Sequence, residues 1–112
     1  MTRSLTAPCD SDVTVTATAP LQHLCPFVDE VDQGTVTITW RVDGSTFELH
    51  RLRDYLDAYA GARLSHEQVA DRIRHDLSAI DGVDLVAVET TWTTAGMEVT
   101  CSTSPTHAGA QR

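Results

Sequence analysis

The chain has 112 residues, which is the size of one domain with a hydrophobic core. Its hydrophobic fraction of 41% and charged fraction of 21% are ordinary for a soluble globular protein and argue against a membrane-spanning chain. The formal net charge of -8 disfavours a nucleic-acid partner, because such partners are bound largely by Lys and Arg residues that neutralise phosphates.

The two ends of the chain are rich in small and polar residues and show no apolar period. Residues 1–11 and 104–112 are therefore predicted to be flexible tails around a single domain at 12–103. The first residues also lack the apolar core of a secretory signal, which predicts a cytoplasmic protein.

Two strands are predicted in the first half of the chain. Apolar residues alternate with Thr from 12 to 18, the period of a half-buried strand, and Pro20 is expected to end it. The same alternation predicts a second strand at 35–42, after which Asp43-Gly44 turns the chain. Residues 22–34 are predicted to be a loop, and they hold a thiol, a histidine and several carboxylates. A loop of this composition indicates a functional site.

Helices and further strands follow in the second half. Apolar residues at helical spacing predict a helix over about 46–60, and Ser65 with Gln68 three residues later predicts a capped start for a second helix. Strands are predicted at about 85–92 and 97–103. The order ββααββ indicates an α+β fold in which an antiparallel four-stranded sheet carries both helices on one face.

Three cysteines, an odd number without a CxxC spacing, indicate reduced thiols and not a disulfide framework. Taken singly, the polar residues of interest have ordinary explanations. Cys25 could be a buried apolar filler, Asp32 a solvated loop residue, and Glu67 a carboxylate favoured by the helix dipole. Their combination is more informative than any one of them.

The order and spacing of several features resemble the QueF family of 7-cyano-7-deazaguanine reductases. These features are Leu24-Cys25-Pro26, an Asp seven residues after the Cys, Glu48-Leu49 at the start of a helix, and His66-Glu67 at the start of the next. The resemblance covers residues 21–103. It implies the tunnelling fold of GTP cyclohydrolase I, in which subunits join into an oligomeric barrel with active sites at subunit boundaries.

The resemblance also implies roles for individual residues. A nitrile carbon is a poor electrophile, so a thiolate must attack it to form a covalent thioimide while an acid protonates the nitrogen. By resemblance, Cys25 is the nucleophile and Asp32 its proton-transfer partner. Glu67 accepts the N–H groups of the 7-deazapurine, a small-molecule substrate, and His66 helps to hold it.

The family binds NADPH through a motif that departs from its usual form in this chain. The sequence from Glu48 to Tyr55 reads ELHRLRDY, so that His50 and Arg53 replace two Lys residues and Asp54 adds a negative charge. Arg51 and Arg53 are candidate phosphate ligands, together with Glu48 and His50 of the same motif. A merely solvated helix face is an equal alternative.

Other functions remain open at this point. A QueF-like amidinotransferase would add ammonia to the thioimide to form archaeosine in transfer RNA, a partner that the acidic chain disfavours unless high salt screens its charge. A zinc cyclohydrolase could use His23, Cys25 and Cys101, although one residue between ligands is a poor spacing for a tetrahedral site. A non-enzymatic interaction module would leave Cys25 unreactive. The resemblance favours the reductase, without a metal.

Overall fold

The computed structural model describes residues 4–103, and its longest feature is a hairpin of two strands, β2 (Thr14–Leu24) and β3 (Val31–Val42). The expected end of the first strand at Pro20 is wrong. β2 is an edge strand of the sheet, where the N–H that a Pro lacks can face away from the partner strand. The expected loop at 22–34 is accordingly reduced to residues 25–30, and the rest of that segment is paired.

The sheet is completed by β5 (Val83–Thr94) and β6 (Met97–Thr103), giving the antiparallel order β2-β3-β5-β6. Both predicted strands exist, and β5 is longer at both ends than its sequence pattern indicated. Ala95 and Gly96, with φ of 54° and 77°, connect them in a tight turn that matches the twist of the strands.

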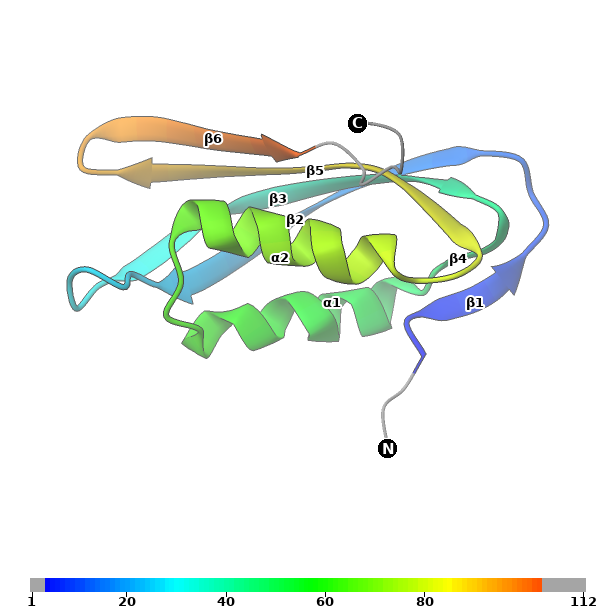
Figure 1. The fold of residues 1–112 in the computed structure, drawn as a ribbon, viewed down its shortest axis with the longest axis horizontal. Helices are drawn as coiled ribbons and strands as arrows, with labels where there is room; N and C mark the ends of the chain where they lie inside the picture. Colours follow the sequence, from blue (N-terminus) through cyan, green and yellow to red (C-terminus); the bar gives the residue numbers. More distant parts are fainter. Residues whose placement is uncertain (1–3, 104–112) are drawn as a thin grey trace, which may run out of the picture.

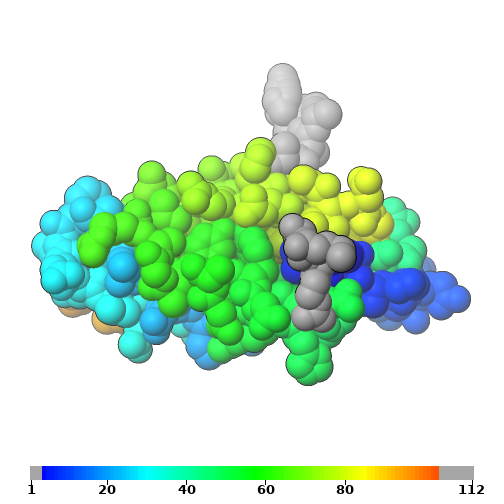
Figure 2. Space-filling model, turned by 90° about the horizontal axis from the view of Figure 1, so that it is seen from below, coloured from blue at the N-terminus to red at the C-terminus, as the bar shows by residue number. Residues whose placement is uncertain are grey.

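Both helices lie on one face of this sheet, as predicted (Figure 1). They are α1 (Leu49–Asp57), which continues into a 3₁₀ turn, η1 (Ala58–Gly61), and α2 (His66–Ser78). The capping box at Ser65 and Gln68 is confirmed. Figure 2 looks onto this helical side, where the helices cover the middle of the face and the loop after β2 extends beyond them at one end.

A second, two-stranded sheet was missed by the sequence patterns. β1 (Thr6–Cys9) pairs with β4 (Gly44–Phe47), so part of the predicted N-terminal tail is structured and the first helix begins later than expected. Phe47 is buried and packs edge-on against Trp40 with ring centroids 4.9 Å apart. The predicted tail at 104–112 lies outside the described residues.

The hydrophobic core fills the space between the sheet and the helices. The core includes, from the strands, Leu21, Val36, Ile38, Trp40, Leu85, Val88 and Trp92, and from the helices, Leu52, Leu56, Val69, Ile73 and Leu77.

None of the helices within 4–103 combines the length and apolar character needed to cross a bilayer.

Candidate active site

Strand register brings the polar residues together at one end of the sheet. His23 of β2 pairs directly with Asp32 of β3, and two positions further along β3, Gly34 pairs with Trp92 of β5. The side chains of His23, Asp32 and Trp92 lie on the face of the sheet that the helices cover. His23 is 0% exposed and Asp32 is 6% exposed. A buried carboxylate and a buried histidine are costly unless they have partners, so this cluster is a candidate functional site.

Gly34 makes room for the indole of Trp92. A Cβ atom at position 34 would lie 2.1 Å from the carbonyl oxygen of Thr91 and 2.7 Å from the Trp92 ring. The Trp92 indole N–H donates to Thr90 Oγ1 at 3.0 Å, which fixes the ring in its plane. Trp92 therefore forms a rigid surface under the start of α2.

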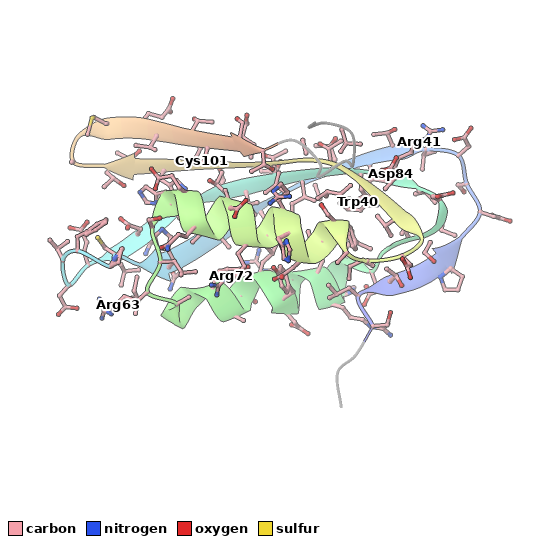
Figure 3. All side chains as sticks on the ribbon, viewed as in Figure 1. Trp40, Arg41, Arg63, Arg72, Asp84 and Cys101 are labelled. Carbon is pink, nitrogen blue, oxygen red and sulfur yellow. The ribbon has the colours of Figure 1, made fainter. Side chains whose placement is uncertain are left out.

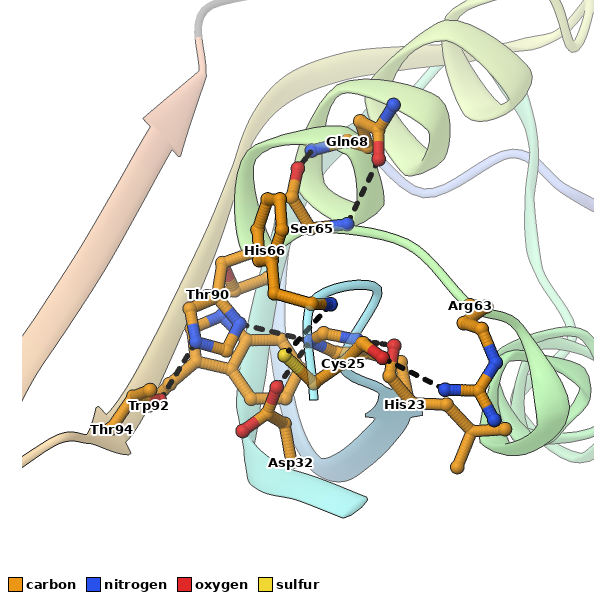
Figure 4. A network of polar contacts seen from close by, with 12 residues as sticks. His23, Cys25, Asp32, Arg63, Ser65, His66, Gln68, Thr90, Trp92 and Thr94 are labelled. Carbon is orange, nitrogen blue, oxygen red and sulfur yellow. Dashed lines mark hydrogen bonds and ion pairs between the residues drawn. The ribbon is translucent and has the colours of Figure 1, made fainter. Parts of the chain in front are cut away.

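His66, the first residue of α2, stacks on this surface and extends the polar cluster (Figure 4). Its Nδ1 lies 2.9 Å from His23 Nε2, and its Nε2 lies 2.8 Å from Thr94 Oγ1. His23 Nε2 in turn lies 3.8 Å from Asp32 Oδ2. A continuous chain of polar atoms thus connects the buried carboxylate to Thr94, which is only half-buried.

Burial lowers the pKa of His66, and the nearby negative charge of Asp32 opposes this effect. This shift favours the neutral imidazole, in which one ring nitrogen carries a hydrogen and the other accepts a hydrogen bond. The role of His66 in holding the substrate or moving a proton stays a prediction.

Cys25 is the first residue after β2, and its backbone is held on several sides. Its N–H donates to the carbonyl of Glu30 at 2.9 Å, and its own carbonyl accepts from Arg63 Nη1 at 3.0 Å. The N–H of Phe27 lies 3.4 Å from the sulfur, a contact that stabilises negative charge there. The thiol is half-buried, and the close-up shows it on the same side of the site as Asp32.

Glu67 is exposed in the first turn of α2. Burial raises the pKa of the Cys101 thiol on β6, and the negative charge of Glu67 adds to this rise, because the start of α2 lies near that strand. The predicted substrate ligand therefore lies beside the neighbouring His66 but toward the edge of the sheet.

The predicted NADPH motif has structural contacts at several positions. Glu48 caps α1 by accepting from the N–H of His50, and this hydrogen bond lowers the pKa of Glu48. Arg51 donates to the carbonyl of Ser4 at 3.1 Å. Arg53 is more accessible, although it pairs with Asp57 at 3.2 Å. It borders a cavity of about 290 Å³ between β2 and α1.

The zinc set that the sequence left as an alternative, His23 with Cys25 and Cys101, is not brought together within residues 4–103. Cys101 lies on β6 (Figure 3), and the donor atoms that come within 4.8 Å of one another in residues 4–103 belong to His23, Asp32 and His66. The 2.9 Å separation of the two histidine nitrogens is that of a hydrogen bond. Two nitrogens on a tetrahedral zinc would be roughly 3.4 Å apart, given Zn–N bonds of about 2.1 Å.

His23 and Thr94 are the residues whose part in the site the sequence patterns missed. His23 was considered only as a zinc ligand. The one available signal was parity, since His23 has the same strand face as the apolar residues 17, 19 and 21.

Comparison with known proteins supports the resemblance, although no protein-family model matches the chain. The NADPH-dependent 7-cyano-7-deazaguanine reductase of Rhodopirellula baltica is 34% identical over 73 residues, which are 65% of this chain and 60% of the reductase. The enzyme of the same name from Chlorobium luteolum is 31% identical over 78% of this chain and 76% of its own length.

The fold has a close counterpart among solved structures. The apo crystal structure of the archaeosine synthase QueF-Like superposes with a TM-score of 0.75, covering 86% of this chain and 96% of the synthase. The two sequences are 21% identical, so this likeness shows the fold, the tunnelling fold that the resemblance implied.

Proposed function

The chain belongs to the QueF family, and from that membership we propose that it converts the nitrile of 7-cyano-7-deazaguanine through a covalent Cys25 thioimide. The observation that carries this proposal is a backbone-fixed Cys25 at the same end of the sheet as the buried Asp32 carboxylate, which has two histidines between it and the surface. Nitrile addition requires a nucleophile and a proton donor, and we assign these roles to Cys25 and Asp32.

In the proposed first step, the Cys25 thiolate attacks the nitrile carbon and forms the C–S bond. One π bond of the nitrile breaks, and its nitrogen takes a proton from Asp32. Glu67 accepts adjacent N–H groups of the purine-like base, and His66 helps to hold it. Addition of the thiolate alone would leave a negative charge on the nitrile nitrogen. A buried acid favours the addition because its proton makes the thioimide neutral.

We propose reduction to the aminomethyl base as the overall reaction. When NADPH is bound, it supplies hydride. Arg53 would hold one of its phosphates, because this guanidinium is 44% exposed and borders the cavity between β2 and α1. His50, which is 97% exposed, is a second candidate for the same anion.

Amidine formation with ammonia is the second candidate. Glu48 accepts from the N–H of His50, and Arg51 donates to the carbonyl of Ser4. Because Arg51 is engaged within the fold, few cations of the motif are left for a dinucleotide. In this alternative the helix face is only solvated, and the base could be part of a nucleic acid.

Replacement of Arg53 by Ala distinguishes the two reactions. If Arg53 binds phosphate, the variant should raise the KM for NADPH by roughly tenfold, because a charge-assisted hydrogen bond contributes about 1.5–3 kcal/mol. Adduct formation by Cys25 should not change. The measurement is turnover of 7-cyano-7-deazaguanine with NADPH or with ammonium, each at low and at molar salt. Turnover with ammonium and none with NADPH at either salt concentration would replace the reductase by the amidine-forming enzyme.

We propose that copies of the chain pair through the edges of their sheets. In residues 4–103, β2 and β6 each have a neighbour on one side only, and unpaired strand edges bind other strands readily. Glu67 lies near β6, so such pairing would place the substrate ligand at a subunit boundary. Light scattering should show an oligomer at micromolar concentration, whereas a stable folded monomer would contradict the proposal.

A further inference from the structure

We propose that Arg63 is a positioning residue that holds the Cys25 thiol at the correct place relative to the bound base. This inference rests on the proposed function, because it concerns the addition of Cys25 to the nitrile. Arg63 lies in the short segment between η1 and α2, and its Nη1 donates to the Cys25 carbonyl oxygen at 3.0 Å (Figure 4). The contact is to the backbone of the nucleophile, so its effect on the reaction is exerted through the position of Cys25.

The loop that carries Cys25 is poorly supported by the rest of the fold. Residues 26–30 are all exposed, and Phe27, the largest of them, is 84% exposed. Within residues 4–103, the hydrogen bonds of this loop other than the one from Arg63 join its own residues, such as the Cys25 N–H to the Glu30 carbonyl at 2.9 Å. A loop without buried apolar contacts has low local stability. The hydrogen bond from Arg63 is therefore an important tie between this loop and another part of the chain.

The segment that carries Arg63 is itself firmly held. It runs parallel to the end of β2, where the Leu24 N–H donates to the Ala62 carbonyl at 2.9 Å and the Leu64 N–H donates to the Leu24 carbonyl at 3.2 Å. Ala62 and Leu64 also pack against the core. None of these contacts uses the Arg63 side chain, so a substitution at position 63 should leave the segment in place.

The same segment leads directly into the residues proposed to bind the base. Ser65 caps α2, and His66 and Glu67 are the first two residues of the helix. Arg63 thus connects the nucleophile loop to the element that carries the substrate ligands. Attack in a bound complex requires the reacting atoms to lie about 3–3.5 Å apart, and a misplacement of about 1 Å can cost roughly 100-fold in rate. Arg63 therefore fixes the sulfur relative to the nitrile of a base that Glu67 holds.

The ion pair of Arg63 contributes less than this hydrogen bond. Arg63 Nη2 lies 3.8 Å from Asp29 Oδ1, and both side chains are exposed. Exposed ion pairs contribute little because water screens the two charges. The hydrogen bond to the Cys25 carbonyl is therefore the contact that holds the loop.

The test compares adduct formation in Arg63→Ala, Arg63→Lys and the wild type. Each protein is mixed with 7-cyano-7-deazaguanine at several concentrations, and intact mass is followed over time to give a maximal rate and a half-saturating concentration. Thermal melts report folding, and peptide mapping after iodoacetamide treatment gives the rate at which Cys25 is alkylated without the base.

Arg41→Ala is the matched control for these measurements. Arg41 is 50% exposed, compared with 53% for Arg63, and it likewise pairs with one exposed carboxylate, that of Asp12. It lies at the opposite end of the β2–β3 hairpin from Cys25 (Figure 3). Its replacement should leave the rate of adduct formation unchanged.

We expect Arg63→Ala to lower the maximal rate by roughly 10-fold to 100-fold, with little change in the half-saturating concentration or the melting temperature, because Glu67 and the core are unaltered. Arg63→Lys should recover part of the rate, since an ammonium group can donate to the same carbonyl. Alkylation of Cys25 in Arg63→Ala should be as fast as in the wild type or faster, because the thiol is still present and its loop is less restrained.

A wild-type maximal rate in folded Arg63→Ala would overturn the proposal. An equal slowing of alkylation and adduct formation would also overturn it, because Arg63 would then affect the reactivity of the thiol and not its position. A change in the half-saturating concentration alone would assign Arg63 to substrate binding instead. If the wild type forms no adduct, the proposed function itself fails. Arg63→Met keeps the apolar stem without the donor, and it replaces Arg63→Ala in every comparison if the Ala variant does not fold.

Discussion

Cys25→Ala should eliminate the covalent adduct with 7-cyano-7-deazaguanine entirely. Ala keeps the extended backbone before Pro26 and the hydrogen bond from the Cys25 N–H to Glu30, so the loop should retain its form. What it removes is the sulfur that forms the bond to the nitrile carbon. Intact-mass spectrometry should show the mass of the nitrile base added to the wild type and nothing added to the variant.

The other two cysteines provide the controls for this experiment. Cys9 lies on β1 and Cys101 on β6, and neither lies in the loop that holds Cys25. Cys9→Ala and Cys101→Ala should therefore form the adduct as the wild type does. An adduct that persists in Cys25→Ala but is lost in Cys101→Ala would assign the nucleophile to β6.

Gly34→Ala should destabilise the fold by about 3 kcal/mol or more, although it adds a single methyl group. That methyl would lie 2.1 Å from the Thr91 carbonyl oxygen and 2.7 Å from the Trp92 ring. The first atom belongs to the backbone of the neighbouring strand and cannot move aside without separating β3 from β5. The indole would be displaced as well, and with it the surface on which His66 stacks.

Chemical denaturation measures this effect directly. Gly61→Ala is the matched control, because a Cβ atom there meets nothing within 4 Å. We expect a large fall in the transition midpoint for Gly34→Ala and nearly none for Gly61→Ala. If the two variants unfold at the same denaturant concentration, the close approach of Trp92 to Gly34 is not a requirement of the fold.

The fold class was predictable because its signals are local. Alternating Thr and apolar residues indicate strands, and the Ser65 capping box indicates the start of α2. Pairing between distant strands gives no such signal. β1 consists of four residues whose apolar pattern is weak, and it exists because it pairs with β4. The strand end at Pro20 was misjudged because an edge strand tolerates a Pro that a central strand excludes.

The site was predictable only where family resemblance carried a residue. Cys25, Asp32 and His66 were named in advance, and the structure places them at one end of the sheet. The partner of Asp32 depended on register, because His23 faces it only when Leu24 pairs with Val31. Nothing within the sequence of either strand specifies that register, which is determined by the side chains that the sheet buries against the helices.

In the β2–β3 hairpin, the predicted acid and the predicted nucleophile stand on different parts of the chain, and this has an evolutionary consequence. Asp32 is part of the paired ladder, whereas Cys25 stands just beyond it in the connecting loop. A residue gained or lost in that loop would shift the thiol and leave the carboxylate and its histidine in place. A change in the length or sequence of this one loop would therefore alter the nucleophile without altering the paired strands that hold Asp32 and His23.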